Sequence, residues 1–234
     1  IRDSGYGGNS GDWFGLLPFA AAGLMAASMD CRGQMGAGTF TNGVISHYYR
    51  GHIVAGLDDP DPANLTFRHV FLDAAQLAGL LMERPEIAGD RVGVFGGSQG
   101  GGLTLACAAL EPRVKRLVSL FPFLSDYRRV WEMDLAVGAY EELKSFFRCF
   151  DPNHQREDEI FTRLGYIDVQ YLAPRIKGQT LMATAMMDTI CPPSTQFAAY
   201  NKITAPKDML FYPDFAHESL PGMDDRILTL MTTL

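Results

Sequence analysis

Short apolar stretches alternate along the chain with longer stretches of helical periodicity. The apolar stretches lie at 24–30, 91–97, 116–122, 180–188 and 209–213. The stretches in which apolar residues recur every three or four positions lie at 67–83, 101–111, 194–202 and 223–233. This pattern predicts strands that are each followed by a helix. Because such alternation builds a sheet of parallel strands with helices on both faces, we predict a doubly wound, mostly parallel α/β fold.

One stretch, at 126–175, interrupts the alternation with aromatic and charged residues and contains no convincing strand. We predict that it forms a helical insertion within a single α/β domain that comprises residues 1–234. Its aromatic residues are Tyr127, Trp131, Phe146, Phe147 and Phe150. These side chains either pack the insertion onto the sheet or line a cap above the carboxyl ends of the strands, where open α/β sheets bind ligands.

The composition excludes several classes of protein. A net charge of −7 argues against a nucleic-acid or anionic-membrane partner, because proteins that bind these surfaces usually carry a basic patch. No apolar run reaches the roughly 18 residues that span a bilayer, and no signal peptide is visible at the first residues. The 4 cysteines lie far apart without a C-x-x-C pair. We therefore expect a soluble, cytoplasmic protein with free thiols and a small or neutral substrate.

Five glycines surround one serine and one glutamine in VFGGSQGGGL at 94–103. A phosphate-binding P-loop would need a lysine after the last glycine of its motif, and neither this motif nor G-x-G-x-x-G fits. The motif G-x-S-x-G fits around Ser98, between an apolar stretch and a helical one. It predicts a nucleophile on a strained turn, with small residues two positions before and after it so that strand and helix can approach. An ordinary strand-to-helix turn is the alternative.

A nucleophilic serine requires a histidine base and a carboxylate, which follow the serine in the order acid, then histidine on this fold. Three of the 5 histidines precede Ser98, and His154 lies among charged residues in the predicted insertion. His217 remains, in YPDFAHES just after the last predicted strand, and we predict that it is the base.

Two carboxylates are the main candidates for the acid that orients His217. Asp188 closes a predicted strand, and we favour it because the acid should follow a strand that precedes the histidine. Asp126 is the rival, although Arg128 and Arg129 beside it offer an alternative role in a salt bridge. A third carboxylate, at position 214, lies too close to the histidine along the chain to be favoured.

The reaction also requires donors that stabilise a negatively charged oxygen in the transition state. The backbone N–H of Gln99, directly after the serine, is one candidate. The second is the backbone N–H of Tyr6 in GYGG at 5–8, where glycines allow close approach to a ligand. A flexible turn without a role in catalysis is the alternative for this segment.

These motifs together resemble one family of the α/β-hydrolases, the acetyl xylan esterases and cephalosporin C deacetylases of carbohydrate esterase family seven. The likeness rests on RGQ at 32–34, GGSQG at 96–100, DTICPPST at 188–195 and HE at 217–218, in the family's order. It continues through SGYGG, YYRG and PFLSDY and covers nearly the whole chain.

The resemblance implies a serine esterase that removes acetyl groups from acetylated xylo-oligosaccharides and other small acetyl esters, cephalosporin C included. It implies Ser98 as nucleophile, His217 as base, Asp188 as the acid, and an oxyanion hole made by Tyr6 and Gln99. By the same analogy, Arg32 supports the loops of the site. The resemblance implies no cofactor and no metal ion, and a homo-oligomer, a hexamer whose active sites face an interior space.

The chain departs from the family in three places. Ser4 stands where the family usually has a histidine, and MGAG follows RGQ where a glycine usually comes at once. The chain also begins where the third strand of the fold should be ending. We therefore expect an α/β-hydrolase fold without its N-terminal strands and interpret the chain as a fragment. A truncated, non-catalytic hydrolase that acts as a binding module is the alternative function, and a peptidase of the same fold is a third.

Overall fold

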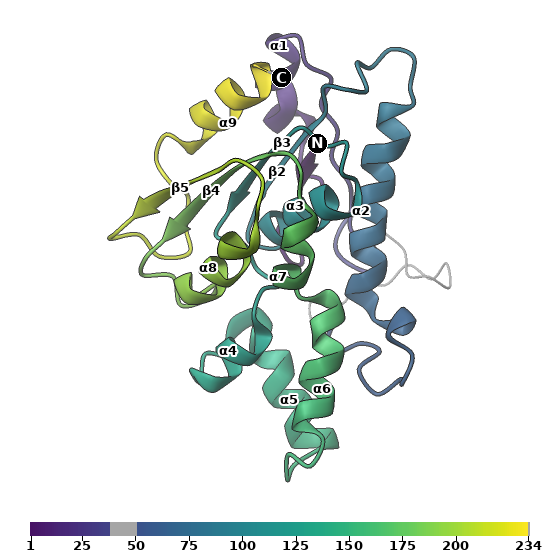
Figure 1. Ribbon diagram of the computed structural model, residues 1–234, viewed down its shortest axis with the longest axis vertical. Helices are drawn as coiled ribbons and strands as arrows, with labels where there is room; N and C mark the ends of the chain where they lie inside the picture. Colours follow the sequence, from purple (N-terminus) through teal and green to yellow (C-terminus); the bar gives the residue numbers. More distant parts are fainter. Residues whose placement is uncertain (38–50, 234) are drawn as a thin grey trace.

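The computed structural model describes residues 1–37 and 51–233 (Figure 1). Its sheet contains five strands, all parallel, which lie side by side in chain order. The strands are β1 (Arg2–Asp3), β2 (Gly93–Gly97), β3 (Arg116–Leu120), β4 (Gln179–Ala185) and β5 (Lys207–Tyr212). The predicted parallel sheet is therefore confirmed, and four of the five predicted strands match β2 to β5.

The predicted strand at 24–30 was wrong. This segment contributes one isolated parallel bridge, between Ser28 and Arg2, and the N–H of Arg2 donates to the carbonyl of Ala27 over 2.9 Å. The segment does not form a strand because its neighbour, β1, is two residues long and offers too few backbone groups for a ladder of hydrogen bonds. The segment nevertheless lies where a strand would pair with the free side of β1.

Helices cover both faces of the sheet, as a doubly wound fold requires. They are α1 (Leu17–Ala21), α2 (Thr66–Met82), α3 (Gln99–Leu110), α4 (Tyr127–Glu132), α5 (Glu141–Phe150), α6 (Glu157–Leu164), α7 (Val169–Leu172), α8 (Pro193–Lys202) and α9 (Met223–Thr232). Single turns of 3-10 helix lie at Trp13–Leu16, Pro62–Asn64, Gly138–Tyr140, Gly165–Ile167 and Ala173–Arg175. Figure 1 shows α2 and α9 on opposite sides of the sheet.

The core divides into two clusters because successive side chains of a strand point to opposite faces. Leu117 of β3 packs in the cluster that contains residues of α2 and α3, whereas Val118 packs in the cluster that contains residues of α9. All residues of α3 from Gln99 to Ala109 are buried. The helix that follows the elbow serine is thus fixed on every side.

The segment between β3 and β4 forms α4 to α7, and Figure 1 shows α4, α5 and α6 beyond the edge of the sheet. Its aromatic side chains pack mainly with one another and with the core: Tyr127 and Phe147 are buried, and the rings of Trp131 and Phe147 lie 4.8 Å apart. Phe150 is the exception, with 64% of its surface exposed. The packing interpretation therefore describes these aromatics better than the cap interpretation.

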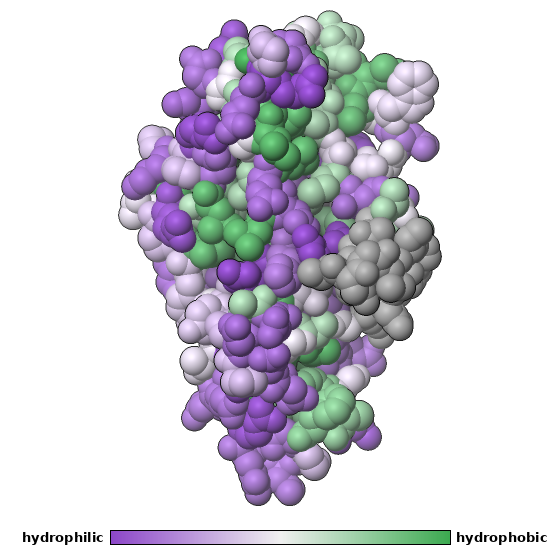
Figure 2. Space-filling view, turned by 90° about the vertical axis from the view of Figure 1, so that its right-hand side faces the viewer, coloured by the Kyte–Doolittle hydropathy of each residue, from purple (hydrophilic) through white to green (hydrophobic). Residues whose placement is uncertain are grey.

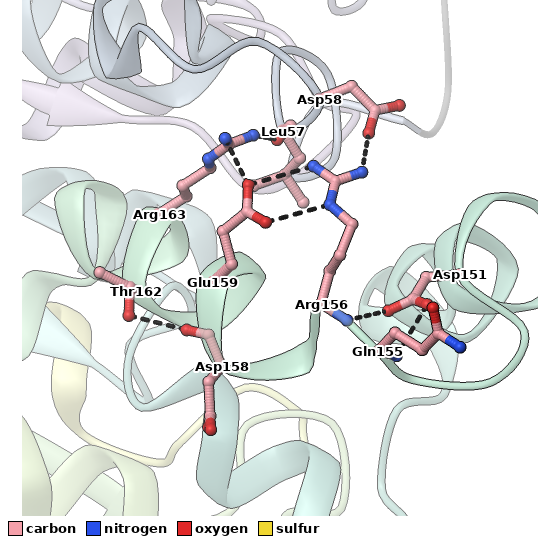
Figure 3. Close-up of polar contacts among 9 residues, drawn as sticks. All are labelled: Leu57, Asp58, Asp151, Gln155, Arg156, Asp158, Glu159, Thr162 and Arg163. Atoms are coloured by element: carbon pink, nitrogen blue, oxygen red, sulfur yellow. Dashed lines mark hydrogen bonds and ion pairs between the residues drawn. The ribbon is translucent and has the colours of Figure 1, made fainter.

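Charged side chains of α6 and of Arg156, directly before it, hold the segment that precedes α2 (Figure 3). Arg156 donates to the Asp58 carboxylate over 3.0 Å, and Arg163 donates to the carbonyl of Leu57. Glu159 accepts from both arginines. Exposed ion pairs of this kind each contribute little stability, but the network links α6 to a segment about a hundred residues earlier in the chain.

The hydropathy of the surface varies along the molecule. Figure 2 views it from the side of α2 and shows apolar side chains gathered in separate patches, mostly in its upper half, above a largely hydrophilic lower part. Within the described ranges, none of the helices has both the length and the apolar character needed to cross a membrane. All four cysteines are free thiols, as predicted.

Candidate active site

Ser98 lies on the sharp turn between β2 and α3, with φ 58° and ψ −121°. A residue other than glycine adopts such a backbone conformation only at a cost of about 1–3 kcal/mol. The surrounding backbone holds it there: the Ser98 N–H donates to Leu120 over 3.0 Å, and its carbonyl accepts from Gly102 and Phe123. The turn is thus the strained elbow that the motif predicts.

The glycines around the elbow are required by space. A Cβ atom on Gly96 would lie 2.6 Å from the backbone of Gly100, and one on Gly100 would lie 2.3 Å from the carbonyl oxygen of Asp3. Real Cβ atoms do not approach backbone atoms this closely. The prediction that the residues two before and two after Ser98 must be small is confirmed.

A chain of hydrogen bonds joins Ser98, His217 and Asp188. The Nε2 atom of His217 lies 3.0 Å from the Ser98 hydroxyl, and its Nδ1 atom lies 2.8 Å from a carboxylate oxygen of Asp188. An ionised carboxylate only accepts hydrogen bonds, so Nδ1 carries the proton and Nε2 is free to accept from the serine. The Asp188 side chain is fully buried, whereas 24% of the His217 side chain is exposed.

The second oxygen of Asp188 fixes the carboxylate in place. It accepts from the backbone N–H groups of Ile190 and Cys191, each over 2.8 Å. The carboxylate therefore has three donors and one orientation. The side of His217 is covered by Phe121, whose ring centroid lies 4.7 Å from that of the imidazole. No motif or spacing in the sequence singled out Phe121.

The rival acid, Asp126, does not reach His217. Its carboxylate caps α4 by accepting from the backbone N–H of Arg129 over 3.3 Å. Arg128 pairs instead with Asp158 over 2.9 Å. The structure therefore replaces the salt bridge that we considered for Asp126 by a helix cap, made from a left-handed backbone at Asp126 (φ 50°).

The two residues predicted for the oxyanion hole lie on adjoining segments. Gln99 is the first residue of α3, where backbone N–H groups have no acceptor within the helix. Its side-chain amide donates to the carbonyls of Ser4 and Gly5 over 3.2 and 3.3 Å. The glycine-rich segment that contains Tyr6 is thus held beside the elbow.

Gln34 completes this attachment. Its side chain is fully buried, exchanges hydrogen bonds of 2.7 and 3.0 Å with the Gln99 amide, and accepts from the N–H of Gly7 over 3.1 Å. The sequence marked it only as part of RGQ, without a role. Arg32 of the same motif makes two hydrogen bonds of 2.6 and 2.5 Å with Asp73 of α2, which raise the pKa of the guanidinium further. Arg32 therefore anchors the RGQ loop and lies outside the hydrogen-bonded chain of Ser98.

Asp188, Cys191 and His217 also offer three atoms of the kind that bind metals, all within 4.8 Å of one another. The hydrogen bonds already described use both carboxylate oxygens and both ring nitrogens. Burial, the largest cause, and the Asp188 carboxylate raise the pKa of the Cys191 thiol, which keeps it protonated and a weak ligand. A metal ion would have to break the chain of hydrogen bonds, so these residues do not form a suitable metal site.

The fold and this site define the class of the protein. A parallel sheet with helices on both faces, a strained serine directly after a strand, and a histidine and buried carboxylate from later loops make it an α/β-hydrolase. The sequence matches the model of the acetyl xylan esterase (AXE1) family over residues 1–234. The chain belongs to this family.

Related proteins agree with this result. The crystal structure of acetyl xylan esterase 1 from Thermoanaerobacterium sp. JW/SL YS485 is 56% identical, with a TM-score of 0.95, over 100% of this chain and 73% of that one. The acetyl xylan esterase from Paenibacillus sp. R4 is 38% identical, with a TM-score of 0.92, over 99% of this chain and 72% of that one.

A curated relative is the acetyl esterase Axe7A of Xylanibacter ruminicola (strain ATCC 19189), 35% identical over 170 residues. The match covers 73% of this chain and 36% of the relative, so the chain corresponds to about a third of that protein's length.

Proposed function

We propose that this protein is a serine esterase that removes O-acetyl groups from carbohydrates through an acyl-serine intermediate. The observation that carries the proposal is the chain of hydrogen bonds from Ser98 through His217 to Asp188, at 3.0 and 2.8 Å. A serine hydroxyl becomes an effective nucleophile only with such a base, and the base works only in the tautomer that the carboxylate fixes.

The proposed reaction has two steps. Ser98 Oγ attacks the acetyl carbonyl while His217 Nε2 takes its proton and Asp188 stabilises the imidazolium. The negative charge that develops on the carbonyl oxygen is bound by the backbone N–H groups of Tyr6 and Gln99. His217 then protonates the departing sugar oxygen, which leaves acetyl-Ser98. A water molecule that gives a proton to the same histidine attacks this ester and releases acetate, and the proton returns to Ser98.

The family and its named members support the proposed substrate class. Acetylated xylo-oligosaccharides are the proposed substrates, with cephalosporin C as a further acetyl ester. A homo-oligomer, by family resemblance a hexamer, and a cytoplasmic location are part of the same proposal. The acidic net charge of −7 supports a neutral ester rather than an anionic polymer as substrate.

The length of the acyl chain provides the test. We expect fast hydrolysis of p-nitrophenyl acetate, a steep fall toward the butyrate ester, release of acetate from acetylated xylo-oligosaccharides, and no activity in Ser98→Ala. Comparable rates on long acyl chains would indicate a lipase-like enzyme instead. A folded protein without any ester hydrolysis would favour the alternative, a hydrolase fold that acts only as a binding module.

A further inference from the structure

Glu142, in the first turn of α5, is a carboxylate buried away from Ser98, with 5% of its surface exposed. One of its oxygens accepts from the hydroxyl of Tyr6. The other accepts from the backbone N–H groups of Ile53 over 2.9 Å and Val54 over 3.4 Å. Burial of a carboxylate is costly unless donors compensate it, and here the donors come from two segments far away in the sequence.

The Tyr6 side chain extends from the glycine-rich segment beside the elbow into this buried region. Its hydroxyl also lies 3.3 Å from Nδ1 of His52, whose Nε2 lies 3.2 Å from the carbonyl of Gly33 in the RGQ loop. The Tyr6 ring packs on Phe123, with 5.5 Å between centroids. The backbone N–H of Phe123 in turn holds the carbonyl of Ser98 over 2.9 Å.

The Tyr6 side chain is one of several anchors of the glycine-rich segment. Gly5 is exposed, and a Cβ atom placed there would meet nothing within 4 Å, so one side of the backbone next to Tyr6 faces open space, while the Gly5 carbonyl accepts from the N–H of Gly8 over 3.0 Å. The side chains of Gln34 and Gln99 bond the backbone atoms of Ser4, Gly5 and Gly7. These bonds hold the backbone on both sides of Tyr6, and the bonds of the Tyr6 side chain add a third attachment, at Tyr6 itself.

We propose that Glu142 is a positioning residue for catalysis: it holds the Tyr6 hydroxyl and thereby aims the Tyr6 backbone N–H at the oxyanion. The inference rests on the proposed esterase function. It makes α5, in the helical segment between β3 and β4, part of the support of the oxyanion hole. A displacement of a catalytic group by about 1 Å can cost about 100-fold in rate, so the loss of one hydroxyl bond should be visible in kcat.

Tyr6→Phe is the direct test, because it removes the hydroxyl and keeps the ring and the backbone N–H. We expect kcat for p-nitrophenyl acetate to fall about tenfold or more, with KM changed less than about twofold, because the bond acts on the transition state. Binding of a trifluoromethyl ketone, to which Ser98 adds to form a tetrahedral oxyanion, should weaken by the same factor as kcat/KM.

Tyr127→Phe is the matched control. It also removes a tyrosine hydroxyl, in this case a buried one of the helical segment that donates to the Ile167 carbonyl over 3.2 Å and not to Glu142. This variant should lose stability but keep kcat. In Glu142→Gln the amide oxygen can stay on the N–H groups of Ile53 and Val54 while its NH₂ group donates to the Tyr6 hydroxyl, so this variant should keep more activity than Glu142→Ala. In a double variant, Tyr6→Phe should add little to the loss of kcat that Glu142→Ala causes, because both substitutions remove the hydrogen bond between the Tyr6 hydroxyl and Glu142.

Two results would overturn the inference. One is a kcat in Tyr6→Phe equal to that of the Tyr127→Phe control, and the other is a loss confined to KM. Both leave the esterase function intact, since the unchanged protein still hydrolyses the ester. If the unchanged protein neither hydrolyses the ester nor reacts at Ser98 with a fluorophosphonate, the proposed function fails and the inference fails with it.

Discussion

The substitution Asp188→Asn tests whether this carboxylate fixes the tautomer of His217. An asparagine has the same shape but replaces one acceptor oxygen by an NH₂ donor. If its oxygen stays on the N–H groups of Ile190 and Cys191, the NH₂ group faces Nδ1 of His217. That nitrogen must then accept, the imidazole proton moves to Nε2, and Ser98 loses the acceptor for its own proton.

The other orientation of the asparagine is unfavourable. It would turn the NH₂ group toward two backbone donors that now bond the carboxylate over 2.8 Å each. Leaving two buried N–H groups without acceptors costs about 1–3 kcal/mol each, or roughly 2–6 kcal/mol together. The wrong tautomer of His217 is therefore the dominant state. In serine proteases the equivalent change lowers kcat about 10⁴-fold, and we expect a loss of about this size, which corresponds to about 5 kcal/mol of transition-state stabilisation.

The assay is kcat/KM for p-nitrophenyl acetate, with thermal unfolding as a check that the variant is folded. Asp126→Asn is the matched control, because this rival carboxylate only caps α4, and its variant should retain kcat/KM. A folded Asp188→Asn protein whose kcat/KM falls by less than about tenfold would refute the reasoning. A large loss in Asp126→Asn would refute the choice between the two acids.

Two further predictions concern stability. Gly100→Ala should lower the unfolding temperature and abolish activity, because the added Cβ would lie 2.3 Å from the carbonyl oxygen of Asp3. Overpacking of this kind typically costs about 1–3 kcal/mol. An active variant of unchanged stability would contradict this prediction and would show that the backbone at the elbow can shift. Burial raises the pKa of Asp168 from 3.8 to about 6, which favours its protonated form in the folded state. Its contribution to stability is therefore fully present below about pH 4 and is lost as pH rises through about 6, on the order of 3 kcal/mol in total. Denaturant unfolding from pH 4 to 7 should show this loss in the unchanged protein and not in Asp168→Asn, and parallel curves for the two would contradict it.

The sequence predicted the parts of the site that depend on chain order. A G-x-S-x-G motif between a strand and a helix identifies Ser98, and the fixed order of the three residues leaves His217 and favours Asp188. The structure brings these three side chains together because parallel strands bring their carboxyl ends to one edge of the sheet, whatever the distance along the chain. The steric need for glycine at positions 96 and 100 follows from the same turn.

Features that depend on three-dimensional packing were not predictable. Whether the segment 24–30 forms a strand depends on the length of β1, which its own apolar pattern does not reveal. A salt bridge was the alternative role considered for Asp126 because charge pairs are visible in sequence, whereas its role as the cap of α4 is not. Glu142 and Tyr6 lie 136 residues apart, and a glutamate at the start of a helix ordinarily indicates only a favourable charge at the helix terminus.

Covalent labelling of Ser98 tests the central claim most directly. The folded protein is treated with a fluorophosphonate, and the adduct is located by mass spectrometry of its peptides while ester hydrolysis is followed in parallel. We expect one adduct per chain, on Ser98, formed in proportion to the loss of hydrolysis, and a strongly reduced rate of labelling in His217→Ala. The absence of an adduct on the folded protein, or an adduct on another residue, would contradict the account.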